Sequence, residues 1–102
     1  PGPSAKKDAD AETLARQSYD LARQVNYEGG MIRSLLLLGD ICARNNRTEE
    51  ALRFYLDVEE KATLTNNSSL LFTACTVLGD LYFKEKIYGN ARQYYLKALG
   101  LQ

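Results

Sequence analysis

Histidine is absent from the 102 residues of this sequence, and cysteine occurs only twice, at Cys42 and Cys75. Without histidine, neither a zinc site of the common type nor a histidine general base is expected. Two cysteines so far apart also do not make the dense disulfide framework of a small secreted domain. Because both lie among apolar residues, we expect buried, reduced thiols and a cytoplasmic protein. No phosphate-binding glycine loop occurs either, so the sequence predicts no enzyme, no metal and no cofactor.

Proline is equally scarce, since its two copies are Pro1 and Pro3, and nothing blocks helix formation from Ser4 onward. An excess of charge is also missing, because 13 basic and 13 acidic residues cancel. A near-neutral domain has no strong long-range attraction to nucleic acid or anionic lipid, so neither is expected as a partner. The longest apolar run is residues 35–38. A spanning helix needs about 20 apolar residues, so no membrane insertion is expected.

The sequence does contain an internal repeat. Residues 78–81 (Leu-Gly-Asp-Leu) repeat residues 38–41 (Leu-Gly-Asp-Ile), and residues 91–96 likewise repeat residues 51–56, both at an offset of 40. The same offset leads back from Ala51 to Ala11. A shared offset over separate blocks is hard to obtain by chance, so the sequence predicts half a repeat followed by two full ones.

Each repeat is expected to form two helices, because its apolar residues recur three and four positions apart. Over the chain this spacing predicts helices at about 8–25, 28–45, 48–64, 68–85 and 88–100. Asn, Thr and Ser in the links are suited to turns and caps, with Ser68 or Ser69 as the expected N-cap of the fourth helix. The predicted organisation is a tag remnant or linker at 1–7 and a helical domain at 8–102, made of a half repeat at 8–26 and repeats at 27–66 and 67–102.

The repeat resembles the tetratricopeptide repeat, whose pattern is aromatic-x2-Leu-Gly-x2-Tyr followed by Ala-x3-Phe. Residues 75–82 read Cys-x2-Leu-Gly-x2-Tyr, followed by Ala91-x3-Tyr95; residues 35–42 read Leu-x2-Leu-Gly-x2-Cys, followed by Ala51-x3-Tyr55. The resemblance runs from about residue 11 to 101, although the period of 40 exceeds the usual ~34 and the closing proline is absent. This longer repeat is similar to the long repeats of kinesin light chains, Leu-Gly-Asn spindle-orientation scaffolds and bacterial regulators.

This resemblance implies an all-α fold, a right-handed α-solenoid of antiparallel helix pairs. Small residues such as Gly39 and Gly79 would let its helices approach closely, and Tyr55 and Tyr95 would fill the space between neighbours. The tyrosines at positions 82, 88, 94 and 95 are accordingly expected in the core rather than as stacking platforms for bases.

The resemblance also implies a binding surface, because the first helix of each pair lines a concave groove in that family. The residues that it places there are Arg33, Leu36, Leu37, Asp40, Arg44, Thr73, Thr76, Asp80, Phe83 and Lys84. Some family members clamp a carboxylate with asparagine at the positions of Asp40 and Asp80, whose negative charge would instead repel one.

Two interpretations of this surface stay open. Asp40 with Arg44, and Asp80 with Lys84, are either solvated helix pairs contributing about 0.2–0.5 kcal/mol each or contacts for a partner. Leu36 and Leu37 are covered either by adjacent helices or by a bound segment.

The predicted function is a non-catalytic protein–protein interaction scaffold that binds a peptide or helix segment in a concave groove. The alternative is a self-association or regulatory linker module of a larger sensor kinase or transcription regulator. Open apolar ends of the solenoid, with no polar capping helix after Leu101, would then pack on the rest of a parent chain or join copies into a homo-oligomer.

Overall fold

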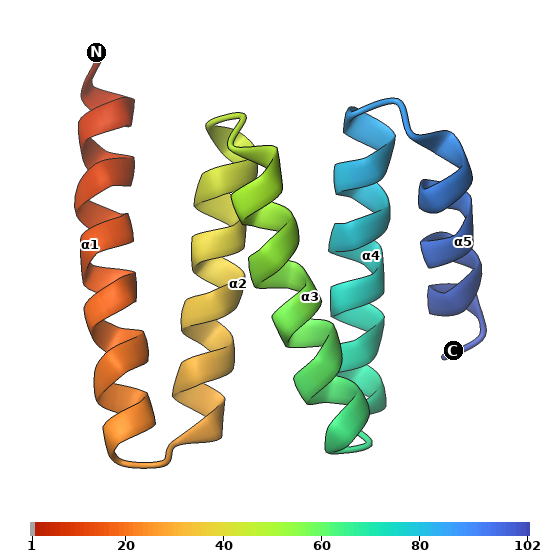
Figure 1. Cartoon of the computed structure of the whole chain (residues 1–102), viewed down its shortest axis with the longest axis horizontal. Helices are drawn as coiled ribbons and strands as arrows, with labels where there is room; N and C mark the ends of the chain where they lie inside the picture. The colour runs from red at the N-terminus through yellow and green to blue at the C-terminus, as the bar shows by residue number, and fades with distance from the viewer. Residues whose placement is uncertain (1) are drawn as a thin grey trace. The chain divides into compact units, whose positions relative to one another are not determined.

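Five helices and no strand make up residues 2–102, the part of the chain that the computed structural model describes (Figure 1). The helices are α1 Pro3–Gln24, α2 Glu28–Arg44, α3 Thr48–Leu64, α4 Ser68–Lys84 and α5 Tyr88–Leu99. The predicted all-α, helical-repeat class is confirmed, and the last four helices begin and end within one residue of their predicted bounds. The right-handed superhelical path stays a prediction.

The start of α1 differs from its predicted position. The helix begins at Pro3 rather than at residue 8, with proline in the first turn and no side-chain cap. Proline is suited to this position because its fixed φ is helical and its missing N–H has no helical acceptor there. Residues 3–7, expected to be a tag remnant or linker, are therefore helical, whereas Pro1 lies outside the described residues.

The same turn joins every pair of consecutive helices. Its central residue is left-handed, with φ of 55° at Asn26, 61° at Asn46, 53° at Asn66 and 64° at Lys86. In each turn the N–H of the next residue donates to the carbonyl five positions earlier, as Tyr27 N does to Ala22 O at 2.7 Å. This is the Schellman ending of a helix, in which asparagine tolerates the left-handed conformation better than lysine.

One cap differs from the prediction. Asn67, rather than Ser68 or Ser69, is the N-cap of α4, and its Oδ1 accepts from Leu70 N at 3.0 Å. The left-handed turn at Asn66 places residue 67 in extended backbone, which is the conformation that an N-cap requires.

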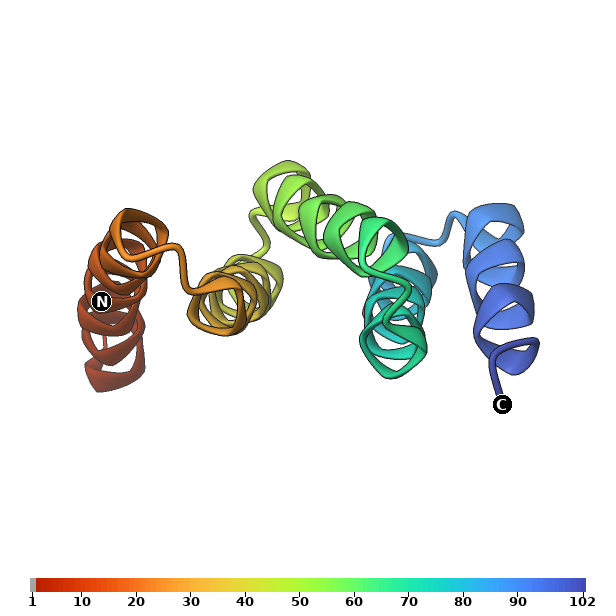
Figure 2. The ribbon, with the colours of Figure 1, turned by 90° about the horizontal axis from the view of Figure 1, so that it is seen from below.

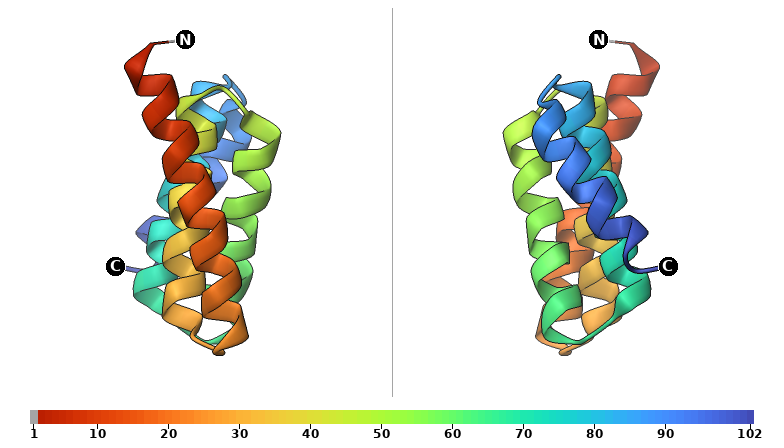
Figure 3. Two further views of the ribbon diagram at one scale, coloured as in Figure 1. Left: turned by 90° about the vertical axis from the view of Figure 1, so that its left-hand side faces the viewer. Right: turned by 90° about the vertical axis from the view of Figure 1, so that its right-hand side faces the viewer.

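The chain divides into two compact units, the first ending at Ala51 and the second running from Leu52 to Gln102. In the first unit α1 and α2 lie side by side and antiparallel, as the end-on view in Figure 2 and the left panel of Figure 3 show. In the second unit α5 packs in the same manner on α4 (Figure 3, right panel). The predicted boundaries of the repeats stay a prediction.

Small residues on α1 let α2 approach closely in the first unit. Ala15 and Ala22 are buried there. Leu35, Leu38, Ile41 and Cys42 of α2 are buried as well. A Cβ at Gly30 would lie 3.0 Å from the Cβ of Ala22 and 2.9 Å from the ring of Tyr27, so any side chain at this position would overpack the contact.

A glycine has the same role in the second unit. Gly79 of α4 is buried, and a Cβ there would lie 2.5 Å from the Tyr95 ring of α5. The predicted close approach at Gly79 is thereby confirmed. The surrounding buried residues are Tyr55, Val58, Ala62, Ala74, Cys75, Leu78, Leu81, Ala91 and Ala98. The prediction that both cysteines are buried free thiols is also confirmed.

Candidate functional site

A polar cluster lies in the first unit, around the guanidinium of Arg47 in the turn after α2. Its Nη atoms donate to the two carboxylate oxygens of Glu12 on α1, at 2.8 and 2.7 Å. One of them also donates to Cys42 Sγ at 2.9 Å. Glu50, in the first turn of α3, lies 3.3 Å from Arg47 Nε, an ion-pair distance without the alignment of a hydrogen bond. The cluster therefore fastens α1 to the end of α2.

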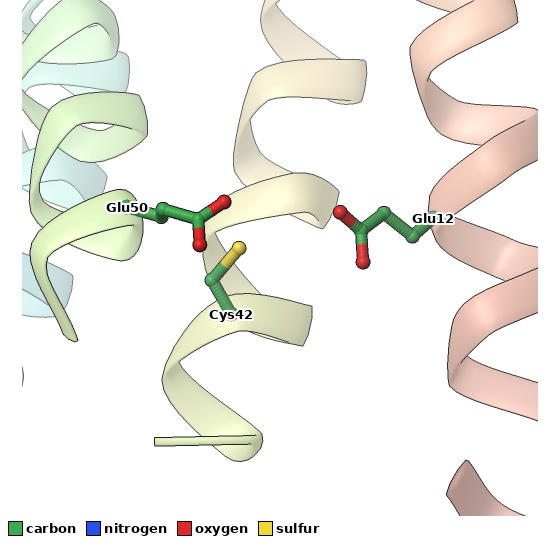
Figure 4. A group of neighbouring side chains, drawn as sticks. All are labelled: Glu12, Cys42 and Glu50. Atoms are coloured by element: carbon green, nitrogen blue, oxygen red, sulfur yellow. The ribbon is translucent and has the colours of Figure 1, made fainter. Parts of the chain in front are cut away.

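Three of these side chains have the donor set of a metal site. Figure 4 shows Glu12 and Glu50 converging from opposite sides on Cys42, and their ligand atoms lie within 4.8 Å of one another. The guanidinium of Arg47 already contacts all three side chains and supplies the positive charge that a metal ion would bring. We therefore interpret the group as an arginine-centred ion network.

The electrostatics of the cluster agree with this interpretation. Hydrogen bonding to Arg47, opposed by partial burial and helped by Arg16, lowers the pKa of Glu12 to about 2. The same bond raises the pKa of Arg47 above its usual value. Burial raises the pKa of the Cys42 and Cys75 thiols, so both stay protonated near neutral pH. A buried protonated thiol is a poor nucleophile, which removes the best candidate for covalent chemistry.

The predicted binding residues on α2 lie mostly at the surface. Arg33, Leu37, Asp40 and Arg44 are exposed, and Leu36 is half-buried. Arg44 pairs with Asp8 of α1, with Nη2 and Oδ1 3.0 Å apart. Arg33 donates to the hydroxyl of Tyr27 at 3.3 Å. Arg44 thus also joins α2 to α1, and Arg33 joins α2 to the residue that precedes it.

The predicted residues on α4 are of two kinds. Thr73 and Thr76 are half-buried and donate their hydroxyls to carbonyls of their own helix, at 3.2 Å to Ser69 O and 2.8 Å to Thr73 O. Asp80, Phe83 and Lys84 are exposed. The polar groups of the threonines are therefore already satisfied, and the last turn of α4 carries the accessible chemistry.

Asp80 has a structural partner that sequence reasoning missed. The hydroxyl of Tyr95 donates to its Oδ1 at 2.5 Å, and this bond is the main cause that raises the pKa of Tyr95 to about 12. Asp80 and Tyr95 lie 15 residues apart, as do Asp40 and Tyr55 in the preceding repeat. This recurring Asp–Tyr separation is the sequence pattern that could have indicated the pair.

The tyrosines divide between the core and the surface. Tyr94 stacks on Tyr82 with ring centroids 5.8 Å apart, and its hydroxyl donates to Glu59 of α3 at 3.3 Å. Lys97 pairs with the same carboxylate at 2.7 Å, joining α5 to α3. Tyr88 and Tyr95 were wrongly expected in the core, since they are 55 % and 37 % exposed. Tyr88 begins α5 and meets the ring of Phe83 with 5.3 Å between the centroids.

An apolar hollow of about 340 Å³ lies beside this aromatic pair, on the face of α5. It is lined by Phe83, Tyr88, Ala91, Arg92, Tyr95, Leu96 and Leu99. Leu99, Leu96 and Phe83 are exposed beside one another around the hollow, and a contiguous apolar patch is more informative than a single exposed leucine. The sequence predicts an open apolar end, but its pattern does not identify these residues as the lining of a hollow.

The pattern in α4 and α5 is shared with a known family. A family model described as tetratricopeptide repeat matches residues 72–102, which span most of α4 and all of α5. This segment of the chain is similar to a tetratricopeptide repeat. Searches of curated proteins and of solved structures gave no significant match. The predicted resemblance to this family is confirmed for residues 72–102, and tetratricopeptide repeats are helical scaffolds that bind other proteins. Within residues 2–102, no helix combines enough length with enough apolar character to cross a bilayer.

Proposed function

We propose that the chain is a non-catalytic interaction module that binds a peptide or helix segment of a partner protein. The binding surface would be the exposed faces of the first helices, α2 and α4, which line the groove in the tetratricopeptide family. Residues 72–102 match that family, and they contain the outward-facing last turn of α4. We also expect the cytoplasm as the location, in keeping with its reduced cysteines.

The proposal rests on the residues exposed at the end of α4. Asp80 and Lys84 supply opposite charges, and Phe83 lies beside them as an apolar contact. Mixed charges around an aromatic side chain favour a ligand of matching pattern over one that is uniformly acidic or basic. One repeat offers few such contacts, so an affinity in the micromolar range, about −8 kcal/mol, is expected.

Charge reversal at Lys84 tests this proposal. Lys84→Glu should weaken a partner recovered from the source cells by about fivefold or more, measured by calorimetric titration with the purified partner. Asp80→Asn should have a smaller effect, because the amide oxygen can still accept from Tyr95. Arg53→Glu, an exposed position on α3, is the charge-matched control. Equal affinity of the Lys84 and Arg53 variants for every partner would contradict the proposal.

Self-association or a linker role in a larger regulator is the second candidate, and the apolar hollow on α5 favours it. A solution mass that rises with protein concentration in analytical ultracentrifugation would support this candidate, whereas a constant monomer mass would exclude self-association.

A further inference from the structure

The turn between α1 and α2 carries a tyrosine at the surface (Figure 1). Tyr27 follows the left-handed Asn26 and is the N-cap of α2, in extended backbone with φ of −97° and ψ of 95°. It is 52 % exposed. Asn67, the equivalent residue in the turn between α3 and α4, is exposed as well, so exposure belongs to this kind of turn. A side chain in such a turn is accessible to a modifying enzyme.

Two glycines determine the direction of the Tyr27 side chain. A Cβ at Gly29 would lie 3.2 Å from the tyrosine hydroxyl oxygen, and a Cβ at Gly30 would lie 2.9 Å from the ring carbon Cδ2. The ring therefore lies across the first turn of α2, where any larger residue would displace it. Its hydroxyl meets the next turn of the same helix, where Arg33 Nη2 donates to it at 3.3 Å.

This pairing of a tyrosine hydroxyl with a guanidinium suits a phosphate. A phosphoryl group on the hydroxyl brings a charge of about −1.5 to −2 and three acceptor oxygens towards Arg33. Because Arg33 is exposed, its side chain has room to turn two N–H groups towards these oxygens. A single hydrogen bond to a neutral hydroxyl then becomes a charge-assisted, bidentate pair.

The other exposed tyrosines have different surroundings. Tyr95 donates its hydroxyl to Asp80, whose carboxylate would repel a phosphate. Tyr88 is 55 % exposed, as much as Tyr27, and its ring packs against Phe83. Tyr88 is therefore the control that matches Tyr27 in exposure but not in its neighbour.

We propose that Tyr27 is a phosphorylation site and that Arg33 binds its phosphate. A separate protein kinase transfers the γ-phosphoryl group of ATP: a P–O bond forms at Tyr27 Oη, the bond from the γ-phosphorus to the bridging oxygen breaks, ADP leaves and the hydroxyl proton is released. Arg33 also belongs to the predicted binding face, so phosphorylation neutralises a positive charge there. This last consequence rests on the proposed function, whereas the site itself does not.

Phosphorylation of the folded chain tests the site. The full chain is incubated under reducing conditions with ATP, Mg²⁺ and a tyrosine kinase of broad specificity, and its tryptic peptides are analysed by mass spectrometry. Residues 24–33 form one such peptide, with Tyr27 as its single tyrosine. Tyr27→Phe should lose most of the incorporated phosphate, and Tyr88→Phe should retain it. Absence of phosphate at Tyr27, or incorporation that Tyr27→Phe leaves unchanged, would overturn the proposal.

A titration of the phosphate tests the role of Arg33. Pairing with a cation favours the dianion, so the second ionisation, ordinarily near pH ~6, moves to lower pH. In phosphorus NMR its midpoint should lie about 0.5 pH lower in the wild type than in Arg33→Gln, as expected of an exposed ion pair. Arg33→Lys should give an intermediate midpoint, and Arg53→Gln, an exposed position on α3, should leave it unchanged.

Equal midpoints for the wild type and Arg33→Gln would show that Arg33 does not bind the phosphate and would overturn the proposal. Neither measurement uses a binding partner. A failure of the proposed function therefore leaves both results unaffected, and the two hypotheses can fail separately.

Discussion

The ion network around Arg47 gives the sharpest prediction about stability. The substitution Glu12→Gln keeps the size of the side chain but removes the carboxylate that accepts two hydrogen bonds from Arg47, at 2.8 and 2.7 Å. Cys42 and Glu50 would then be left as the contacts of a partly enclosed guanidinium. Removal of one partner from such a pair costs more than the pair contributes, because the remaining charge is poorly solvated.

The magnitude follows from the pKa of Glu12. A fall from the ordinary 4.5 to about 2 corresponds to roughly 3–4 kcal/mol at about 1.4 kcal/mol for each pKa unit. The side chain of Arg47 is 36 % exposed and that of Glu12 is 17 % exposed, so solvent screens part of this interaction. We therefore expect Glu12→Gln to lower the free energy of unfolding by about 1–2 kcal/mol at pH 7.

The pH dependence provides a second readout. Because the folded-state pKa of Glu12 lies below its unfolded value, this contribution is present in full above about pH 4.5 and is lost as the pH falls towards 2. The wild type should thus lose about 1–2 kcal/mol over this range that Glu12→Gln does not lose.

Urea unfolding followed by circular dichroism at pH 7 and at pH 3 measures both quantities. Asp10→Asn, an exposed position on the same helix, is the control and should change stability by less than about 0.5 kcal/mol. The reasoning is refuted if Glu12→Gln is as stable as the wild type at pH 7, or if both show the same decrease on acidification.

Three further predictions concern packing, thiols and turns. Gly79→Ala should lower the free energy of unfolding by about 1–3 kcal/mol, because its Cβ would meet the Tyr95 ring at 2.5 Å. Gly89→Ala is the control and should not destabilise α5, because the space around Gly89 is open. An unchanged urea midpoint for Gly79→Ala would contradict the close packing of α4 and α5. Cys42 and Cys75 should react slowly with a thiol reagent at pH 7.5 in the native state, since burial raises their pKa values, and rapid labelling of both would show that they are accessible. Lys86→Gly should stabilise the chain by about 1 kcal/mol in the same unfolding assay, because Lys86 has a φ of 64° that glycine adopts without strain; a loss of stability would show that the left-handed turn is not strained.

The sequence by itself determined the helices and their order. The three- and four-residue spacing of apolar residues fixes which face of a helix is buried, and asparagine in the links fixes where each helix ends. The link after α4 has Lys86 in place of asparagine, and there the end of the helix follows from the 40-residue repeat. These are local properties, so the bounds of α2 to α5 could be predicted within one residue. The glycine of the Leu-Gly-Asp pattern likewise predicted a close approach of helices, because no side chain intervenes.

Only the tertiary structure decided which polar groups meet. Glu12 and Arg47 are 35 positions apart, as are Glu59 and Tyr94, and no helical periodicity joins residues on different helices. The sequence likewise did not show that Thr73 and Thr76 use their hydroxyls within α4, or that Tyr88 lies at the surface. Periodicity gives the direction of a side chain from its own helix axis, whereas its partner and its exposure depend on how neighbouring helices are packed around it.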